Sequence, residues 1–284
     1  MKVVFGCYIY KFHEDYCRDI AEEVHARGGK AIICKDRRTH KDANFTIQPD
    51  EAYPRLGGKG VWINHAFPVI PQNSFYLEKP FKKALRKNSD YIFTFSNAWK
   101  DWHKQFELPV YVVGMPKLDK LFNTEKKENT IFYAPTGNWK KGVTSDGVVD
   151  VSALKKYGDV VYKQHPAVKK RADDKNIKTE QALQNASIVI SDYSSVGIES
   201  IVLNIPTILV DNSKWDNDKN NHISSTARNA AIRVKTQEEI EQAIQTYIDN
   251  PHYLEEERKE YSQQLCDYQG ASAKRTVDVL EALL

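Results

Sequence analysis

No hydrophobic run in the sequence approaches the ~18 apolar residues of a membrane span. The N-terminus is apolar only briefly before it turns charged, which is typical of a first core strand rather than of a secretory signal. The formal net charge of +3 is small for 284 residues, so bulk electrostatics do not indicate a nucleic-acid partner. We therefore expect a soluble, cytoplasmic protein that binds no nucleic acid.

Cysteine is scarce, and no two cysteines form a C-x-x-C pair. The four are Cys7, Cys17, Cys34 and Cys266. Because Cys7 and Cys34 fall in predicted strands, we interpret them as buried thiols of a reducing compartment and propose no zinc site. Two catalytic motifs are also missing. The absence of G-x-x-x-x-G-K-[ST] excludes a Walker loop, and the absence of G-x-S-x-G disfavours a serine hydrolase.

What the sequence does contain is an almost continuous alternation of strand-like and helix-like patterns, which is typical of parallel βαβ units. The predicted strands of a first series are Val3–Tyr8, Lys30–Cys34, Gly60–Asn64, Tyr91–Phe95 and Val110–Val113. Those of a second series are Thr130–Ala134, Asp159–Lys163, Ser187–Ile190, Thr207–Val210 and Ala231–Val234.

A charged segment with little to bury separates the two series, so we predict domains 1–123 and 124–284, with a last helix that can pack back on the first domain. The predicted fold class is α/β. Two Rossmann-like doubly wound domains facing a central cleft are the layout of the GT-B type, with an acceptor side in the first domain and nucleotide-donor binding in the second.

The strongest polar signal is the segment ISDYSSVGIES, residues 190–200. The apolar run Ser187–Ile190 predicts an interior strand, and Ile198, Ile201 and Val202 recur afterwards at helical spacing. The polar residues therefore stand at the carboxyl end of a strand. In open α/β sheets ligands bind there, because helix N-termini present unpaired N–H groups and partial positive charge.

Two interpretations fit Ser194 and Ser195: they cap the following helix, or they hold phosphate oxygens beside its N-terminal amides. A capping box requires Glu or Gln three residues after the serine, but that position after Ser195 is Ile198. Glu199 is thus not explained by capping, and its carboxylate suits ribose hydroxyls. Asp192 either joins this donor-binding group or orients a neighbouring loop.

Two loops after other strands of the second series are also candidates. In PTGNWKKG, Gly137 permits close backbone approach and Lys140 supplies positive charge, as phosphate contact requires; an exposed turn is the competing interpretation. In QHP, Pro166 holds His165 in an extended backbone that can aim its imidazole at a ligand, although a structural histidine fits equally.

In the first domain, His65 follows the third predicted strand. A histidine at a strand end can accept a proton from an incoming hydroxyl, because its ordinary pKa lies near ~6.5. A buried structural histidine is the alternative.

Several motifs together resemble the CDP-glycerol glycerophosphotransferase family, which builds teichoic-acid and related capsule polymers. YAPTGNWKKG is similar to its Ala-Pro-Thr loop, KQHP to its His-Pro motif and ISDYSSV to its Asp-Tyr-Ser-Ser signature. VGMPKLDKLF resembles the segment that joins the domains, with Lys117 in place of the usual arginine, and YQGASAKR resembles the terminal Asp-Gly-x-Ala-Ser segment. The motifs stand in the family's order.

The resemblance implies a GT-B fold, a CDP-linked donor and no obligatory metal or cofactor. Carried over by position, Thr136, His165, Ser194 and Ser195 contact the donor, and Ser272 of the terminal segment joins this donor-binding set. His65 falls on the histidine of the family's Trp-His-Gly motif, a proposed catalytic base, although its neighbours differ in this sequence. We count His165 as the second catalytic candidate.

The resemblance implies transfer of glycerol phosphate, or another polyol phosphate, from a CDP-linked donor to a hydroxyl of a cell-surface polymer or its lipid-linked precursor. Glu199, with Pro206 seven residues later, is instead similar to the ribose-binding glutamate of sugar-nucleotide transferases and UDP-GlcNAc 2-epimerases. A GT-B glycosyltransferase using a CDP-, CMP- or UDP-sugar is therefore the alternative. Epimerisation is disfavoured because it needs no acceptor domain, and a non-catalytic nucleotide sensor is the remaining rival.

A basic cluster in LEKPFKKALRKNSD indicates a further partner. Its members are Lys79, Lys82, Lys83, Arg86 and Lys87. A basic helical face of this kind can meet an anionic membrane surface, which predicts a peripheral location on the inner face of the plasma membrane. A solvated surface helix explains the same pattern.

Overall fold

The structure of the protein is a computed structural model that describes residues 1–7, 12–49, 54–64, 66–67, 79–122, 124, 129–137, 144–165, 177–211 and 226–284. The chain divides into two compact units. Unit 1 comprises Met1–Ala66, Gln72–Phe122 and Gln264–Leu284, and unit 2 comprises Phe67–Pro71 and Asn123–Gln263. None of the described helices combines the length and the apolar character that crossing a membrane requires.

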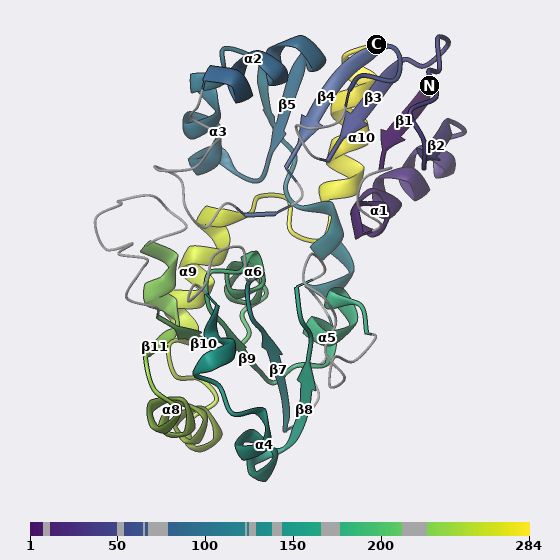
Figure 1. The fold of residues 1–284 in the computed structure, drawn as a ribbon. Helices are drawn as coiled ribbons and strands as arrows, with labels where there is room; N and C mark the ends of the chain where they lie inside the picture. The colour runs from purple at the N-terminus through teal and green to yellow at the C-terminus, as the bar shows by residue number, and fades with distance from the viewer. Residues whose placement is uncertain are drawn as a thin grey trace. The chain divides into compact units, whose positions relative to one another are not determined.

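Unit 1 is built on a parallel sheet with the strand order β2-β1-β3-β4-β5-β6 (Figure 1). The strands are β1 (Lys2–Gly6), β2 (Lys30–Cys34), β3 (Phe45–Gln48), β4 (Lys59–Ile63), β5 (Tyr91–Thr94) and β6 (Val110–Val112). Interior strands such as β1 are apolar almost throughout, because helices cover both faces of a parallel sheet.

The helices of unit 1 each bury one apolar stripe. They are α1 (Phe12–Ala26), α2 (Lys79–Asn88), α3 (Asn97–His103) and α10 (Ser272–Ala282), with the short 3-10 helices η2 (Lys104–Phe106) and η3 (Pro116–Leu121). In α2, Phe81 and Leu85 pack against Trp62 of β4, which turns the basic residues between them outward. The C-terminal α10 lies beside α1 (Figure 1), where Arg27 pairs with Asp278 and Glu281 at 2.7 and 2.9 Å.

Unit 2 contains a second parallel sheet, with the order β11-β10-β9-β7-β8. Its strands are β7 (Thr130–Ala134), β8 (Asp159–Tyr162), β9 (Ile188–Ser191), β10 (Thr207–Val210) and β11 (Ile232–Val234). Its helices are α4 (Val151–Leu154), α5 (Thr179–Asn185), α6 (Ser195–Val202), α8 (Gln237–Asp249) and α9 (Glu255–Leu265), with the 3-10 turns η4 (Ser145–Gly147), η5 (Lys155–Tyr157) and η7 (Ala227–Ala230).

The strand order of unit 2 reverses beside β7, and this reversal decides where a ligand can bind. The chain runs from β7 to β8 on one side and then returns to place β9 on the other side of β7. Helices that follow β7 and β9 therefore leave in opposite directions, and a crevice forms outside the carboxyl ends of these two strands. This topological switch point is the expected ligand position in an open α/β sheet.

One strand of unit 1 was not predicted from the sequence. β3 has only four residues, Phe-Thr-Ile-Gln, in a polar neighbourhood and ahead of Pro49. All four are buried, because β3 lies between β1 and β4 in the interior of the sheet. A short segment with Thr and Gln gives almost no periodic signal, so only its pairing reveals it.

Candidate donor-binding site

Asp192 connects the two loops of the switch point in unit 2. One carboxylate oxygen accepts a hydrogen bond from the Thr136 backbone N–H at 2.8 Å, across the gap between the ends of β7 and β9. The other accepts from both the N–H and the hydroxyl of Ser145, each at 2.8 Å. Of the two sequence interpretations of Asp192, the geometry supports the one in which it orients the neighbouring loop.

The environment of Asp192 is dry, since the residue is 1% exposed. Burial raises the pKa of the Asp192 carboxyl, while the hydrogen bonds from Ser145 and Thr136 act in the opposite direction. Ser145 also shares a hydrogen bond of 2.9 Å with the hydroxyl of Tyr133, itself buried in β7. A buried hydrogen-bond network of Asp192, Ser145 and Tyr133 therefore fixes the loop that follows β7.

The N-terminus of α6 begins at the same edge. Ser194 is its N-cap, and the Ser194 hydroxyl accepts from the Val196 N–H at 3.4 Å. Capping thus explains Ser194 in part. Ser195 is half-buried, and its hydroxyl is joined by no hydrogen bond to another described residue. The helix also packs closely on the sheet: a Cβ at Gly197 would stand 2.7 Å from Leu209 Cδ2.

Glu199 lies one turn further into α6 and is 1% exposed. Its backbone carbonyl accepts from the Leu203 N–H at 3.0 Å, so the residue belongs to the regular part of the helix. A buried carboxylate is retained only with hydrogen-bond partners. The ribose-binding role of Glu199 stays a prediction.

The remaining candidates of unit 2 divide into described and undescribed residues. Gly137 is buried next to Thr136 after β7, and His165 is half-buried after β8. These follow neighbouring strands, so the structure brings the loops of Thr136, His165 and Asp192 to one edge of the sheet. Lys140 lies outside the described residues.

In unit 1, the predicted base His65 also lies outside the described residues. Hydrogen bonds fix its neighbour Asn64. Asn64 directly follows β4 and is 3% exposed. Its carbonyl accepts from the Tyr16 hydroxyl at 3.0 Å, and its side-chain oxygen accepts from the Ala66 N–H at 3.3 Å.

Ser272 is the one described donor-binding candidate outside unit 2. It lies in unit 1, fully buried at the start of α10. Its hydroxyl accepts from the Met115 N–H at 3.0 Å and donates to the Tyr268 carbonyl at 3.0 Å. Its own N–H donates to Asp119 at 2.9 Å. Ser272 therefore starts a helix with its hydrogen-bonding groups engaged inside unit 1, and its donor-binding role stays a prediction.

Sequence reasoning missed two charged residues beside the switch point. Arg228 of η7 is 2% exposed and donates to the Asp192 carbonyl at 2.9 Å and to the Asp211 carboxylate at 2.7 Å. Neither residue belongs to a motif that the sequence analysis singled out. Their meeting depends on the pairing of β9 with β10 and of β10 with β11, which no local pattern encodes.

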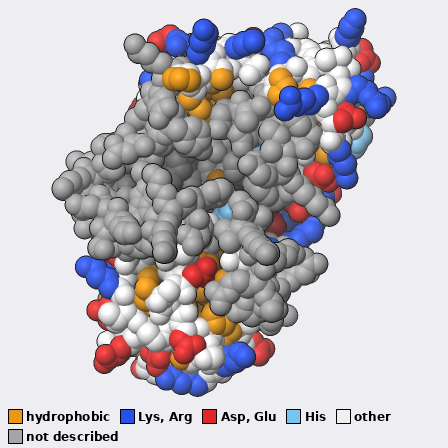
Figure 2. Space-filling view, in the orientation of Figure 1, with side chains coloured by type: hydrophobic (Ala, Val, Ile, Leu, Met, Phe, Trp, Pro, Cys, Tyr) orange, Lys and Arg blue, Asp and Glu red, His pale blue; other side chains and the backbone are white. Residues whose placement is uncertain are grey.

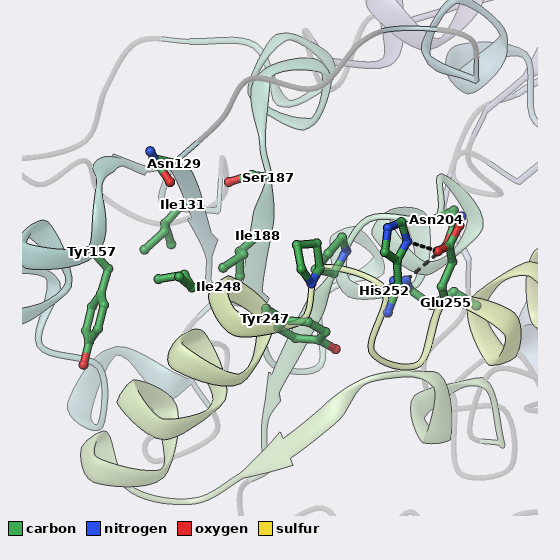
Figure 3. Close-up of a pocket in the computed structure, with 13 residues that line it drawn as sticks. Asn129, Ile131, Tyr157, Ser187, Ile188, Asn204, Tyr247, Ile248, His252 and Glu255 are labelled. Carbon is green, nitrogen blue, oxygen red and sulfur yellow. Dashed lines mark hydrogen bonds and ion pairs between the residues drawn. The ribbon is translucent and has the colours of Figure 1, made fainter.

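A separate pocket of about 480 Å³ lies at the opposite end of the unit 2 sheet (Figure 3). Ile131 and Ile188 line it from the amino ends of β7 and β9, and Ile248 faces them from α8. Asn204 and Glu255 stand at its polar end. Because it opens at the amino ends of the strands, this pocket is not the donor-binding site.

No group of three or more His, Cys, Asp or Glu side chains among the described residues is arranged to hold a metal ion. At the switch point, the described residues offer side-chain hydroxyls, backbone amides and the N-terminus of α6. These groups suit an anionic ligand such as a diphosphate.

A profile of the family described as CDP-Glycerol:Poly(glycerophosphate) glycerophosphotransferase matches residues 86–282, which is most of the chain. The chain belongs to this family. The match confirms the predicted family, the predicted enzyme class and the predicted reaction, in which glycerol phosphate passes from CDP-glycerol to a polymer. Comparison with curated protein sequences gives no match.

Solved structures confirm the fold class. The wall teichoic acid polymerase TagF superimposes with a TM-score of 0.70 at 14% identity, covering 99% of this chain and 88% of that one. A TagF variant soaked with CDPG gives a TM-score of 0.71 at 13% identity and the same coverage. UDP-GlcNAc 2-epimerase from Neisseria meningitidis, bound to UDP-GlcNAc, gives 0.62 at 11% identity, with both chains covered completely. At such identities the likeness supports the GT-B fold alone.

Proposed function

We propose that unit 2 of this glycerophosphotransferase holds the diphosphate of a CDP-linked donor at the β7/β9 switch point, and that the acceptor is a hydroxyl of a cell-surface polymer or of its lipid-linked precursor. The observation that carries the proposal is the Asp192 bridge between the two loops at the N-terminus of α6. This arrangement presents backbone amides and the positive end of the α6 dipole where an anionic ligand is favoured.

In the proposed reaction, the acceptor oxygen attacks the β-phosphorus of the donor. A new phosphorus–oxygen bond forms, the bond between the β-phosphorus and the bridging oxygen breaks, and CMP departs. His65 takes the acceptor proton. The charge that develops on CMP is stabilised by the α6 N-terminus with Ser194, Ser195 and His165, because phosphoryl transfer requires mainly positioning and charge stabilisation. We assign Thr136, Gly137 and Lys140 to the same donor and Glu199 to its ribose.

The test is incubation with CDP-glycerol and a polymer acceptor, with the product linkage read by phosphorus NMR. A new phosphodiester together with CMP is expected. A glycosidic product formed only from CDP-, CMP- or UDP-sugars would establish the alternative glycosyl transfer. CDP binding with no turnover on any donor would establish a sensor.

The role of the α6 N-terminus is tested by Ser195→Ala. We expect the donor KM to rise by about tenfold, because a hydrogen bond to a charged phosphate oxygen is worth about 1.5–3 kcal/mol. Ser152→Ala, in the first turn of α4, is the matched control and leaves KM unchanged. Equal KM values for both variants contradict the site.

The proposed base is tested by His65→Ala. The turnover number should fall by about 10²–10⁴-fold, the range of general base catalysis, while the affinity for CDP stays within about twofold. His25→Ala, an exposed histidine of α1, is the control. Parallel loss of turnover and affinity would assign His65 to binding instead.

We further propose that the reaction needs no resident metal, since the resemblance implies none and the α6 N-terminus offers the required charge. Dialysis against EDTA should leave the rate unchanged. Loss of activity that Mg²⁺ restores would overturn this part of the proposal.

We propose that α2 contacts an anionic membrane surface, such as the inner face of the plasma membrane. Lys83 and Lys87 are exposed on α2, whose apolar face is buried, and Figure 2 shows Lys and Arg side chains gathered over this part of unit 1. Lysine residues near an anionic surface contribute about 1 kcal/mol each. Binding to vesicles with anionic lipid should therefore fall by roughly thirtyfold when both are changed to Gln.

The matched control for the membrane test is the double variant Lys41→Gln with Lys235→Gln, which removes the same charge from exposed positions elsewhere. It should sediment with vesicles as the unaltered protein does. Sedimentation that does not depend on anionic lipid would leave α2 as a solvated surface helix. We also propose a cytoplasmic location, which the sequence analysis predicts, and a role in capsule synthesis, which the family resemblance implies.

A further inference from the structure

Arg228 is a buried cation beside the proposed donor site. It stands in η7, between β10 and β11 along the chain, and is 2% exposed. Burying a guanidinium is costly unless hydrogen bonds and an anion compensate its charge. The contacts that Arg228 makes therefore show what the residue holds in place.

The contacts of Arg228 with other described residues reach Asp192 and Tyr193 at the switch point, and Asp211 at the end of β10. Nη1 donates to the carbonyl oxygen of Asp192 at 2.9 Å. The guanidinium carbon lies 4.6 Å from the centre of the Tyr193 ring, within the range of a cation–π contact. Nη2 donates to Asp211 Oδ1 at 2.7 Å. Arg228 thus contacts both residues that directly precede the N-cap Ser194.

Asp211 fixes the other end of this link to the sheet. It follows β10, and its N–H donates to the Val234 carbonyl at 2.7 Å, which extends the pairing of β10 with β11. Its second oxygen accepts from Nε and Nη2 of Arg233 at 2.7 and 2.6 Å. The carboxylate is therefore held between two guanidinium groups, of which only that of Arg233 is partly exposed.

We infer that Arg228 is a positioning residue of the donor site: by tying the Asp192-Tyr193 backbone to Asp211, it holds the N-terminus of α6 in the geometry that binds the diphosphate. The inference rests on the proposed function.

Lysine cannot replace Arg228 in this role. A single ammonium group lacks the planar fork that reaches a carbonyl and a carboxylate at the same time, and it stacks less well on a tyrosine ring. Arg228→Lys keeps the charge and removes the geometry. It therefore separates positioning from simple electrostatic attraction.

The experiment measures the affinities of CDP and of cytidine by titration calorimetry, with cytidine read by competition. The preference for CDP over cytidine isolates the contribution of the diphosphate. In Arg228→Lys this preference should fall by about tenfold, as expected for the loss of one charge-assisted hydrogen bond, while cytidine affinity is kept. A purely structural loss would lower both affinities together and leave their ratio unchanged.

Arg233→Gln is the matched control, because it removes the outer cation from the same carboxylate and leaves the Arg228 contacts in place. It should keep the preference for CDP within about twofold. Asp211→Asn is the second variant, which keeps the side-chain shape and removes the anion. It should shift the preference in the same direction as Arg228→Lys, and it decides the question if Arg228→Lys does not fold.

If Arg228→Lys keeps the CDP preference unchanged, the inference is overturned and the proposed function stays intact. Where that variant does not fold, an unchanged preference in Asp211→Asn has the same meaning. Failure of the unaltered protein to prefer CDP over cytidine overturns the proposed function and the inference with it. The two failures are therefore distinguishable.

Discussion

Asp192 shows how a single residue of this protein acquires its role. Its place at the end of a predicted strand marks it as a candidate ligand contact, but its oxygens accept from Thr136 and Ser145. A buried carboxylate with several donors organises backbone more readily than it binds an anionic ligand, because like charges repel.

Asp192→Ala should lower the free energy of unfolding by about 1–3 kcal/mol, because it leaves buried N–H donors without an acceptor. Urea unfolding measures this difference. Ser145→Ala, which removes only the hydroxyl donor, should cost less. An equal cost for both variants would mean that the backbone donors find other acceptors when Asp192 is removed.

The cysteines confirm the prediction of buried, unpaired thiols. Burial raises the pKa of the Cys266 thiol to about 12 and raises that of Cys17 well above its ordinary value. Since the thiolate is the reactive form, the folded protein should not react with an aromatic disulfide reagent at pH 7. All four thiols should react in denaturant. A thiol that reacts quickly in the folded protein would contradict the packing around it.

Among the secondary-structure elements, α8 carries a complete start signal. The Thr236 hydroxyl accepts from the Glu239 N–H at 3.2 Å, and the Glu239 carboxylate accepts from the Thr236 N–H in return. Thr236→Ala should therefore lower the free energy of unfolding by about 1 kcal/mol. Thr246→Ala, within the same helix, should change it little, because alanine is the better helix former. Thermal or urea unfolding of the two variants checks the order.

Helix α9 offers a stabilising contribution that depends on pH. The hydrogen bond from Lys259 and, after it, that from His252 lower the pKa of Glu255 to about 2, from an ordinary value of 4.5. A lowered pKa means that Glu255 stabilises the folded state above pH 4.5, and that this contribution is lost as the pH falls towards 2. The Lys259 side chain is about half exposed, so solvent screening should limit the contribution to about 0.5–1 kcal/mol.

The measurement for α9 is urea unfolding of the unaltered protein and of Glu255→Gln from pH 2 to pH 7. Their difference should be largest above pH 4.5 and should vanish near pH 2. Glu257→Gln, an exposed residue in the same first turn, is the control for loss of a carboxylate. A difference that does not vary with pH would show that the charge of Glu255 is not involved.

The two units differ in how the chain builds them: most of unit 2 is one stretch of chain, whereas the C-terminal segment completes unit 1. Residues 123–263 supply the unit 2 sheet, whereas unit 1 needs Gln264–Leu284 to cover α1. In unit 1 the Asp119 carboxylate accepts from the N–H groups of Ser272 and Ala273 at 2.9 and 2.7 Å, which caps α10.

We expect a fragment of residues 123–263 to unfold cooperatively on heating, because each unit buries its own core. A fragment of residues 1–122 should not, because it exposes the apolar surface that α10 covers. Joining residues 264–284 to it through a flexible linker should restore a cooperative transition. Circular dichroism during heating distinguishes these outcomes, and cooperative unfolding of residues 1–122 alone would contradict the role of α10.

Much of the fold was predictable from the sequence. The bounds of β2, β7 and β10 agree with the prediction, because apolar runs between turn residues are local signals. β3 was not predictable, since four residues with Thr and Gln become a strand only between two partners. For the site, the loop of Asp192 was found from the sequence, whereas Arg228 was not.

By itself, the sequence determined the succession of strands and helices, the polar residues at strand ends and the motifs of the family, because periodicity and turn chemistry act over a few neighbouring residues. Tertiary structure alone decided that β9 returns beside β7, and so which loops meet. The bond from Thr136 to Asp192 spans 56 positions and that from Arg228 to Asp192 spans 36. Such contacts form only once the strands are ordered, because strand pairing sets the distance between their ends.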